Sequence, residues 1–354
     1  MPDEPTQEMI RQLTLRKLAF ARELLREHQI PVSGTREALT ERLFGAVDEG
    51  AIPSDDIRLL LDELDAWGDQ RVRLGTMDRR DLRDFRDTDA VRRRIREAGL
   101  DDELLGREHV ALVPPEKLSP MGVQLLEENG TRTVRLLAAK IRIVDIPLTN
   151  ADEVPVARLP ARLRPGPDAT APGVPGAVAG EIVYKPYRRL RQKAVSFAEI
   201  DLDTGVSLIS TTLLKQGMNY HAEFGELLTL FAPLLPLATM VPQELYDAVR
   251  LIRNLPQDEV RIYSRQQRTD VGGTMEIRSF SSIVDLRQDP ALEVAAAALP
   301  NAEGYHCNCR WQIKGKLTEE VHTRIFSPMG EVSILGQVTE NSVRNVLRRI
   351  RSIH

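Results

Sequence analysis

The sequence has few cysteines, few lysines and no long apolar run. Cys307 and Cys309 are the two cysteines among 354 residues, which excludes a disulfide framework and is typical of a reducing compartment, so we expect a cytoplasmic protein. The longest apolar stretch, Phe224 to Val241, is interrupted by Glu226 and two prolines, and no stretch reaches the roughly 20 apolar residues of a membrane helix. The acidic start, Met1 to Glu4, is not followed by an apolar secretion signal. We therefore predict no membrane partner.

Signatures of common active sites are also missing. No Gly-x-Ser-x-Gly motif occurs, and the glycine turn at Asp270 to Thr274 lacks the Lys-Ser/Thr pair of a phosphate loop. His306, Cys307, Cys309 and His322 could supply four zinc ligands, but no second pair has the usual spacing, so we expect buried thiols. We predict no cofactor, no metal and no small-molecule substrate, and we favour a protein that is not an enzyme.

One catalytic alternative stays open. Trp311-Gln312-Ile313-Lys314 lies on an expected strand with Asp285 and Asp289 upstream, an order similar to that of metal-dependent nuclease cores. Such a site would need carboxylates on Mg²⁺ and a lysine that polarises water. We favour the other interpretation, in which these are surface polar residues of an edge strand.

Composition indicates a packed protein of two or three domains. Hydrophobic residues make up 42% of the chain and charged residues 28%, which is ordinary for a globular protein and too apolar for disorder. The net charge of −4 neither favours nor excludes nucleic acid, because the distribution of charge matters more than its sum. Of the basic residues, 40 are arginine and 8 lysine, which is typical of a GC-rich bacterial genome.

The periodicity of apolar residues predicts an α+β fold. A helical spacing in the first 75 residues predicts an all-α N-terminal domain, with helices at Thr14 to about His28, after a cap at Ser33 or Thr35, and from Ser54. A period of two beyond residue 109 predicts antiparallel sheet regions packed against helices. The expected domains are 1–75 (helical), 76–108 (charged helical connector), 109–256 (first sheet region, with a Pro/Gly-rich loop at 150–180) and 257–354 (second sheet region, ending in a basic helix capped at Thr339).

The strongest motif lies between Leu13 and Leu43. Its matching residues are Ser33, Gly34, Arg36, Leu39, Arg42 and Leu43. This pattern resembles the SAP module, a helix–link–helix unit of DNA-associated proteins. The resemblance implies DNA binding at the turn Ser33, Gly34 and Thr35, where a glycine bend lets the amide groups of the second helix face phosphate beside Arg36.

The alternative interpretation of this motif is a helical hairpin that is structural or docks a protein, with Arg42 as an ordinary surface residue. The acidic neighbours weaken the DNA interpretation, because carboxylates oppose phosphate contacts. They are Glu37, Glu41, Asp48 and Glu49.

The end of the chain carries a second pattern. Thr323 to Gly336, followed by Thr339 and an apolar-faced helix, resembles the strand–turn–strand–helix ending of a half of the TATA-binding-protein family. In that family a concave sheet sits on the minor groove and aromatic residues wedge between base steps, which implies a wedge role for Phe326. The alternative is a common α+β sandwich. The order of elements along the whole chain also resembles that of the kinetochore proteins of the centromere protein N type, without a shared motif.

Two basic clusters favour nucleic acid. The first holds Lys185, Arg188, Arg189, Arg191 and Lys193 with two interleaved tyrosines, a composition suited to phosphates and stacked bases, or else to a charged strand edge. The second lies on the last helix, at Arg344 and Arg348 and their neighbours. We therefore predict a non-catalytic DNA-binding protein, such as the DNA-recognition subunit of a bacterial defence or chromosome-maintenance assembly. The alternative partner is a protein, with the chain acting as an adaptor or forming an oligomer.

Overall fold

The structure is a computed structural model. It describes residues 2–106, 116–128, 130–147, 154–155, 183–184, 187–213, 219–269, 272–297, 302–313 and 319–353.

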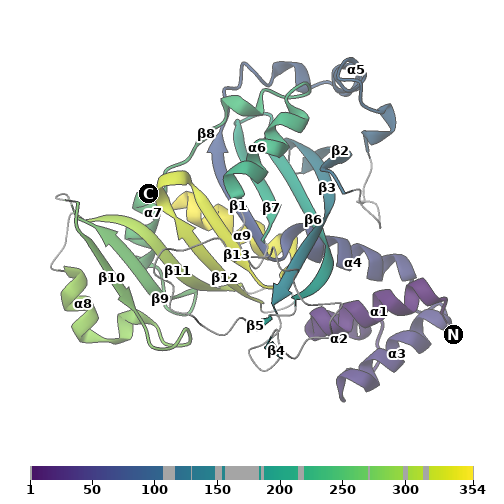
Figure 1. Ribbon diagram of the computed structural model, residues 1–354, viewed down its shortest axis with the longest axis horizontal. Helices are drawn as coiled ribbons and strands as arrows, with labels where there is room; N and C mark the ends of the chain where they lie inside the picture. The colour runs from purple at the N-terminus through teal and green to yellow at the C-terminus, as the bar shows by residue number, and fades with distance from the viewer. Residues whose placement is uncertain are drawn as a thin grey trace. The chain divides into compact units, whose positions relative to one another are not determined.

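Four helices begin the described chain, and strands interrupted by single helices make up the rest (Figure 1). The α-helices are α1 (Glu4–Arg16), α2 (Leu18–Glu27), α3 (Arg36–Asp48), α4 (Ser54–Trp67), α5 (Thr88–Glu97), α6 (Tyr220–Phe231), α7 (Tyr246–Leu251), α8 (Pro290–Ala297) and α9 (Glu340–Ser352). The strands are β1 (Gln70–Thr76), β2 (Ser119–Glu128), β3 (Thr131–Pro147), β4 (Val154–Pro155), β5 (Val183–Tyr184), β6 (Tyr187–Asp201), β7 (Val206–Thr212), β8 (Val241–Pro242), β9 (Val260–Arg268), β10 (Thr274–Arg278), β11 (Glu303–Ile313), β12 (Glu319–Phe326) and β13 (Glu331–Leu335).

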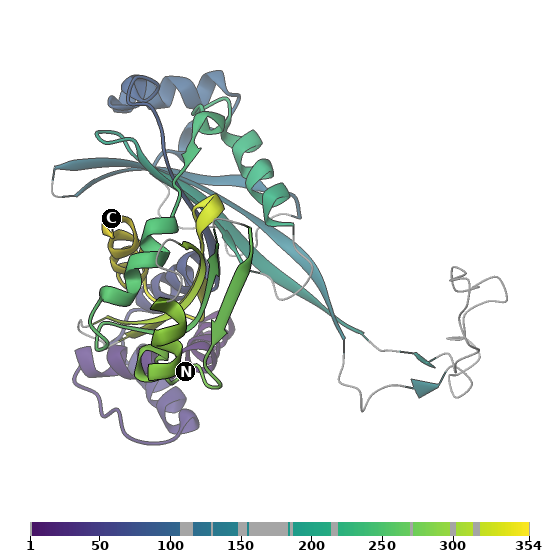
Figure 2. The ribbon, with the colours of Figure 1, turned by 90° about the vertical axis from the view of Figure 1, so that its left-hand side faces the viewer.

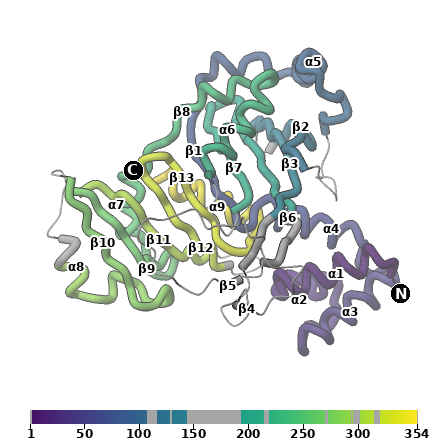
Figure 3. Tube along the Cα trace, in the orientation of Figure 1, coloured from purple at the N-terminus to yellow at the C-terminus, as the bar shows by residue number. Residues whose placement is uncertain are grey.

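The first four helices form a small domain with its own core (Figure 3). Apolar positions at helical spacing, among them Leu13, Leu25, Leu39 and Leu43, are fully buried in this core. The predicted start of a helix at Thr14 is wrong. Thr14 lies inside α1, where its hydroxyl donates to a carbonyl of the preceding turn. The helical conformation is interrupted at Lys17, which separates α1 from α2.

The predicted all-helical domain of residues 1–75 extends too far, because its last residues form a strand. Gln70 to Thr76 form β1, which lies between β13 and β7 in the middle of the main sheet. Polar and apolar side chains alternate along β1, and Val72 and Leu74 are fully buried, which is a strand pattern. The pattern is hard to recognise in the sequence because it follows directly after a helix. The expected connector helix over 76–108 is reduced to α5 and two short 3-10 turns.

The α+β class is confirmed. The main sheet has eleven strands in the order β10-β9-β11-β12-β13-β1-β7-β6-β3-β2, with β8 paired to β1 outside this path. We expected a boundary between two sheet regions at residues 256 and 257, but the strands before and after these residues belong to one sheet. None of the helices in the described ranges is long and apolar enough to cross a membrane.

Helices cover the two faces of this sheet unequally (Figure 2). On one face α7 and α9 pack against β1 and β9 to β13 in one hydrophobic core, to which α9 contributes Val343, Val346 and Ile350 at helical spacing. On the opposite face α6 packs Phe224, Leu227 and Phe231 against the half of the sheet formed by β7, β6 and β3. The remaining half of that second face carries no helix of the described chain (Figure 1).

The end of the chain follows the prediction closely. β12, a turn, β13 and α9 occur in the expected order, and Thr339 caps α9 by accepting from the amide of Ser342. Gly330 makes the turn possible, because its φ is +61° and an added Cβ would lie 2.3 Å from the carbonyl oxygen of Gln243.

Residues 141–193 form a compact unit separate from the rest of the chain. Its described elements are the last part of β3, the first part of β6 and the antiparallel pair β4–β5. Most of the predicted Pro/Gly-rich loop at 150–180 lies outside the described residues.

Candidate nucleic-acid interface

The helix-free half of the second sheet face is the best candidate for a binding surface. We call it the open face; it comprises the side chains of β9 to β13 and β1 that point away from α7 and α9. At its β1 edge, Arg71 and Arg73 lie against the rings of Tyr220 and Phe224 of α6. Alternation along the strands decides which side chains these are, because the neighbours on each strand are buried under the helices. On β11, for example, Cys307, Cys309 and Trp311 are buried in the helix-covered core, so Asn308 and Arg310 point to the open face.

A row of polar side chains crosses the open face in register. Arg324 of β12 lies directly opposite Asn308 of β11 and Ser333 of β13. The row continues to Ser264 and Arg278 on one side and to Arg71 on the other. Side chains directly opposite one another share a face, so these groups lie in one row. Ser264, Asn308 and Ser333 are buried in this row, whereas Arg324 and Arg278 are exposed.

The open face has an excess of positive charge. Two glutamates are each shared by two arginines: Glu320 pairs with Arg261 and Arg310, and Glu331 pairs with Arg71 and Arg73. A third acid, Glu276, pairs with Arg278. Each shared carboxylate leaves one guanidinium charge uncompensated, which favours anions.

Arg324 is the exposed centre of this charge. No ion pair or hydrogen bond of its side chain is found within the described residues, and it is solvent-exposed. Two histidines flank it, and the pKa of each is lowered first by burial and then by the guanidinium of Arg324. For His306, Arg71 and Arg278 act in the same direction and Glu276 in the opposite one. Both imidazoles are thus held neutral beside a free cation, where a phosphate would favour their protonation.

Several polar atoms of the open face lack internal partners. Within the described part of the chain, no acceptor or donor is found for Asn308 Oδ1, Ser264 Oγ, His306 Nε2 or Arg310 Nε, although these atoms are shielded from solvent. Buried polar groups are normally hydrogen-bonded. Because these atoms are shielded from solvent, a ligand on the open face would reach them only after the side chains that cover them move.

Phe326 lies on this face but is not a free wedge. The Arg71 guanidinium lies 4.0 Å from the centre of its ring, and the His306 ring centre is 4.7 Å away. The resemblance to TATA-binding proteins implied an aromatic side chain ready to enter a base step. Instead, Phe326 is a half-buried platform that holds Arg71 in place.

The exposed aromatic side chain at this surface is Phe280. It lies in the loop after β10 and is fully exposed. The loop is tied to the open face by two arginines: Arg310 donates to the hydroxyl of Ser282, and Arg261 donates to the carbonyl of Ile283. The sequence around Phe280 has no periodicity, so this residue could not be predicted from the sequence, and neither could Arg324 and Asn308. The cross-strand register is needed to see that they lie together.

The SAP-like turn is accessible, as its proposed role requires. Ser33, Gly34, Thr35 and Arg36 are all exposed, and Gly34 has a φ of +121°. Thr35 is the cap of α3, accepting from the amide of Ala38. Arg42, in contrast, donates to the carbonyls of Pro31 and Ser33 and so stabilises the turn from within.

Carboxylates compete with phosphate at this turn. The Glu37 carboxylate accepts from its own amide and from the Thr35 hydroxyl, and these hydrogen bonds lower its pKa. Residues 1–67 contain fourteen acidic and eight basic residues. The electrostatics of the helical domain are therefore less favourable for DNA than those of the open face.

The two predicted basic clusters have different outcomes. Lys185 lies outside the described residues; Arg188, Arg189 and Arg191 belong to β6, but their side chains are outside what the structure describes, and Lys193 is half-buried.

On α9, Arg344 is bound to Glu199 at 2.7 Å and to Glu340 at 2.7 Å. It therefore belongs to an internal network and not to an exposed track. Arg348 is exposed.

The residues of the nuclease alternative have structural partners. Asp285 is buried and ion-paired with Arg287 at 2.6 Å, and Asp289 accepts from the amide of Ala291. Gln312 donates to Glu320, and Lys314 lies outside the described residues. Within the described ranges, no three His, Cys, Asp or Glu side chains gather as a metal site.

The prediction of buried thiols is confirmed. Cys307 and Cys309 are fully buried on the helix-covered face, with their sulfurs 3.1 Å apart, and burial raises the pKa of Cys309. His306 and His322 point to the open face, so the sheet separates them from the sulfurs.

Comparisons with known proteins give no relative from which residues could be carried over: no protein-family model matches the chain, and no curated protein matches it.

Proposed function

We propose that the protein binds DNA without acting on it chemically, and that the open face is its principal DNA contact. The observation that carries the proposal is Arg324, which is exposed and has no ion pair or hydrogen bond among the described residues, on a face that also carries Arg261, Arg278 and Arg310. Phosphates would lie on Arg324 and the arginines around it, and Phe280 would stack on a base or sugar at the rim.

Two features support DNA over a small anion. The charge is spread over several strands, since Arg261, Arg310 and Arg324 lie on β9, β11 and β12. Shared carboxylates hold the paired arginines in fixed positions, which lowers the entropy cost of phosphate contacts.

The test is a fluorescence-anisotropy titration of the full chain against a labelled duplex and its labelled single strand. Wild-type binding should weaken steeply between about 50 mM and 200 mM salt, because phosphate contacts release counterions. The Arg324→Gln variant should bind about tenfold more weakly, with a salt dependence smaller by about one phosphate contact. Arg253→Gln is the matched control, since Arg253 is exposed in the 3-10 turn after α7 and outside the open face. Equal affinities for the two variants, or no wild-type binding at low salt, would refute the proposal.

The SAP-like turn is proposed as a secondary contact and can be tested separately. Arg36→Gln removes an exposed cation without touching the core, so a lower salt dependence than wild type would assign one phosphate to the turn. An unchanged salt dependence would leave the open face as the whole DNA contact.

The adaptor alternative has one observation in its favour. The excess of acidic residues in the helical domain repels DNA and suits a basic protein partner. If the adaptor role is correct, the full chain should show no steeply salt-dependent affinity for either DNA probe.

A further inference from the structure

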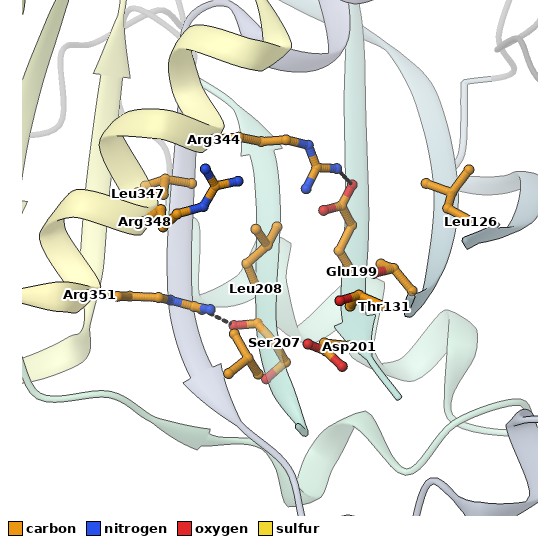
Figure 4. Close-up of a pocket in the computed structure, with 12 residues that line it drawn as sticks. Leu126, Thr131, Glu199, Asp201, Ser207, Leu208, Arg344, Leu347, Arg348 and Arg351 are labelled. Carbon is orange, nitrogen blue, oxygen red and sulfur yellow. Dashed lines mark hydrogen bonds and ion pairs between the residues drawn. The ribbon is translucent and has the colours of Figure 1, made fainter. Parts of the chain in front are cut away.

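A pocket of about 390 Å³ lies on the face of the sheet opposite the open face (Figure 4). Its floor is formed by β7, β6, β3 and β2, and its wall by α9. This volume is within the range of sites that bind small molecules. The pocket is separate from the proposed DNA contact and shares no residue with it.

The wall of the pocket provides two cations, Arg348 and Arg351, that form no ion pair with an acid in the described part of the chain. Arg351 reaches across to β7 and donates to the carbonyl of Ser207 (Figure 4). In the described part of the chain its Nε has no acceptor, although this atom is shielded from solvent. Arg348, one turn earlier on α9, is exposed and makes no ion pair with any described residue.

Arg344, on the same helix, differs from Arg348 and Arg351 because its charge is paired. It also lines the pocket, but it is ion-paired with Glu199 and Glu340. Burial lowers the pKa of Arg351 to about 10, only partly opposed by the charge of Glu199. The cation of Arg351 is therefore desolvated without a carboxylate in contact, a condition that a bound anion would relieve.

The floor of the pocket carries groups of a different kind. Asp201 lines it with a carboxylate whose Oδ1 accepts from the amides of Asp203 and Thr204. Thr131 and Thr133 add hydroxyls. Leu208 adds apolar surface and lies between Arg348 and Thr131 (Figure 4). A ligand that fits must thus offer an anion at one end, some apolar surface in the middle and hydrogen-bond donors at the other end.

We propose that this pocket binds a small organic phosphate with hydroxyl or amino groups, of the size of a sugar phosphate or mononucleotide. The phosphate lies between Arg348 and Arg351, since guanidinium groups match phosphate oxygens in pairs. The hydroxyl or amino groups donate to Asp201. A bare inorganic phosphate would fill only the arginine end.

Isothermal titration calorimetry on the full chain tests this pocket with four probes: inorganic phosphate, ribose 5-phosphate, adenosine monophosphate and adenosine. At least one of the two organic phosphates should bind at least tenfold more tightly than both inorganic phosphate and adenosine. The Arg348→Gln variant should lose at least tenfold in affinity for it, and Arg351→Gln more. Arg349→Gln is the control, because Arg349 lies on the same helix but pairs with Glu259 outside the pocket.

The proposal fails if neither organic phosphate binds more tightly than both inorganic phosphate and adenosine. It also fails if Arg348→Gln binds like Arg349→Gln. Arg348 is exposed, so its replacement should leave folding intact, and the test does not depend on the more buried Arg351 variant. DNA binding by the open face can succeed or fail independently, because Arg324→Gln should leave the affinity for the organic phosphate unchanged.

Discussion

The guanidinium of Arg71 lies 4.0 Å from the ring centre of Phe326 and reaches it across an intervening strand. Arg71 belongs to β1, the first strand in the sequence, and Phe326 ends β12, some 250 residues later in the chain. Between them β13 contributes Glu331 and Ser333, which both accept hydrogen bonds from Arg71. This arrangement joins the first strand of the sheet to its C-terminal half and fixes the direction in which the arginine charge points.

We expect Phe326→Leu to destabilise the protein by about 1–2 kcal/mol, because the ring supplies both buried area and a cation–π contact. Urea denaturation followed by circular dichroism measures this change. Phe280→Leu is the control, since a fully exposed ring contributes little to folding. A stable Phe326 variant with normal unfolding would show that Phe326 is not the platform for Arg71.

Phe280 should matter for binding and not for folding. Removing a ring that stacks on a base typically costs about 1–3 kcal/mol, so Phe280→Ala should weaken DNA binding by roughly tenfold or more. The loss should be larger for the single strand, whose bases are free to stack. Anisotropy titrations at one salt concentration measure it, with a denaturation curve as the check on folding. Unchanged affinity for both probes would place Phe280 outside the interface.

Acidic pH should act on folding and on binding in opposite directions. The pKa values of His306 and His322 are lowered in the folded protein by burial and by Arg324. Between those lowered values and the ordinary value near 6.5, the unfolded chain binds more protons. The contribution of the two histidines to stability is therefore complete above about pH 6.5 and is lost as the pH falls through the folded-state values.

Bound phosphate favours the protonated imidazoles, so DNA binding should take up protons and strengthen as the pH falls from about 7.5 to 5.5. Urea midpoints and anisotropy titrations across this range measure the two effects. Replacing both histidines with glutamine should flatten both pH profiles. If the profiles of the double variant match those of wild type, these imidazoles do not control either process.

The sequence predicted the elements whose signal is local. Thr35 and Thr339 cap helices, Ser54 is the first residue of α4, and Gly330 marks a turn; caps and positive φ angles depend on a few neighbouring residues. β1 was missed because seven residues directly after a helix carry too short an alternation to be separated from it. Thr14 was misassigned because its hydroxyl has two possible uses, as a cap or as a donor within the helix.

The candidate site was harder to predict than the fold. The row through Arg324 and Asn308 depends on which strands are neighbours and on two register shifts between β9 and β11, and neither is encoded locally. The arginine content could not separate Arg344, which is ion-paired inside the protein, from Arg324, which has no ion-pair partner among the described residues. Charge pairing across the sheet decides that difference, and it appears only once the strands are aligned.

Substitution of Glu331 should lower the stability of the protein and raise its DNA affinity, so the two effects can be measured apart. Its carboxylate is 4% exposed and is shared by Arg71 at 2.5 Å and Arg73 at 2.7 Å. Glu331→Gln keeps the shape and removes the charge, which leaves two poorly solvated guanidinium groups without a counter-ion. We expect a loss of about 3 kcal/mol in the free energy of unfolding, at the lower end of what breaking a buried ion pair costs.

The same substitution raises the positive charge of the open face, so DNA affinity at low salt should increase and its salt dependence should steepen. Glu276→Gln is the matched control, because the pair with Arg278 is exposed and contributes at most about 1 kcal/mol to folding. Denaturation curves and anisotropy titrations on the two variants decide the outcome. If Glu331→Gln weakens DNA binding while remaining folded, Glu331 positions the arginines for phosphate; if it leaves affinity unchanged, the DNA contact does not include Arg71 and Arg73.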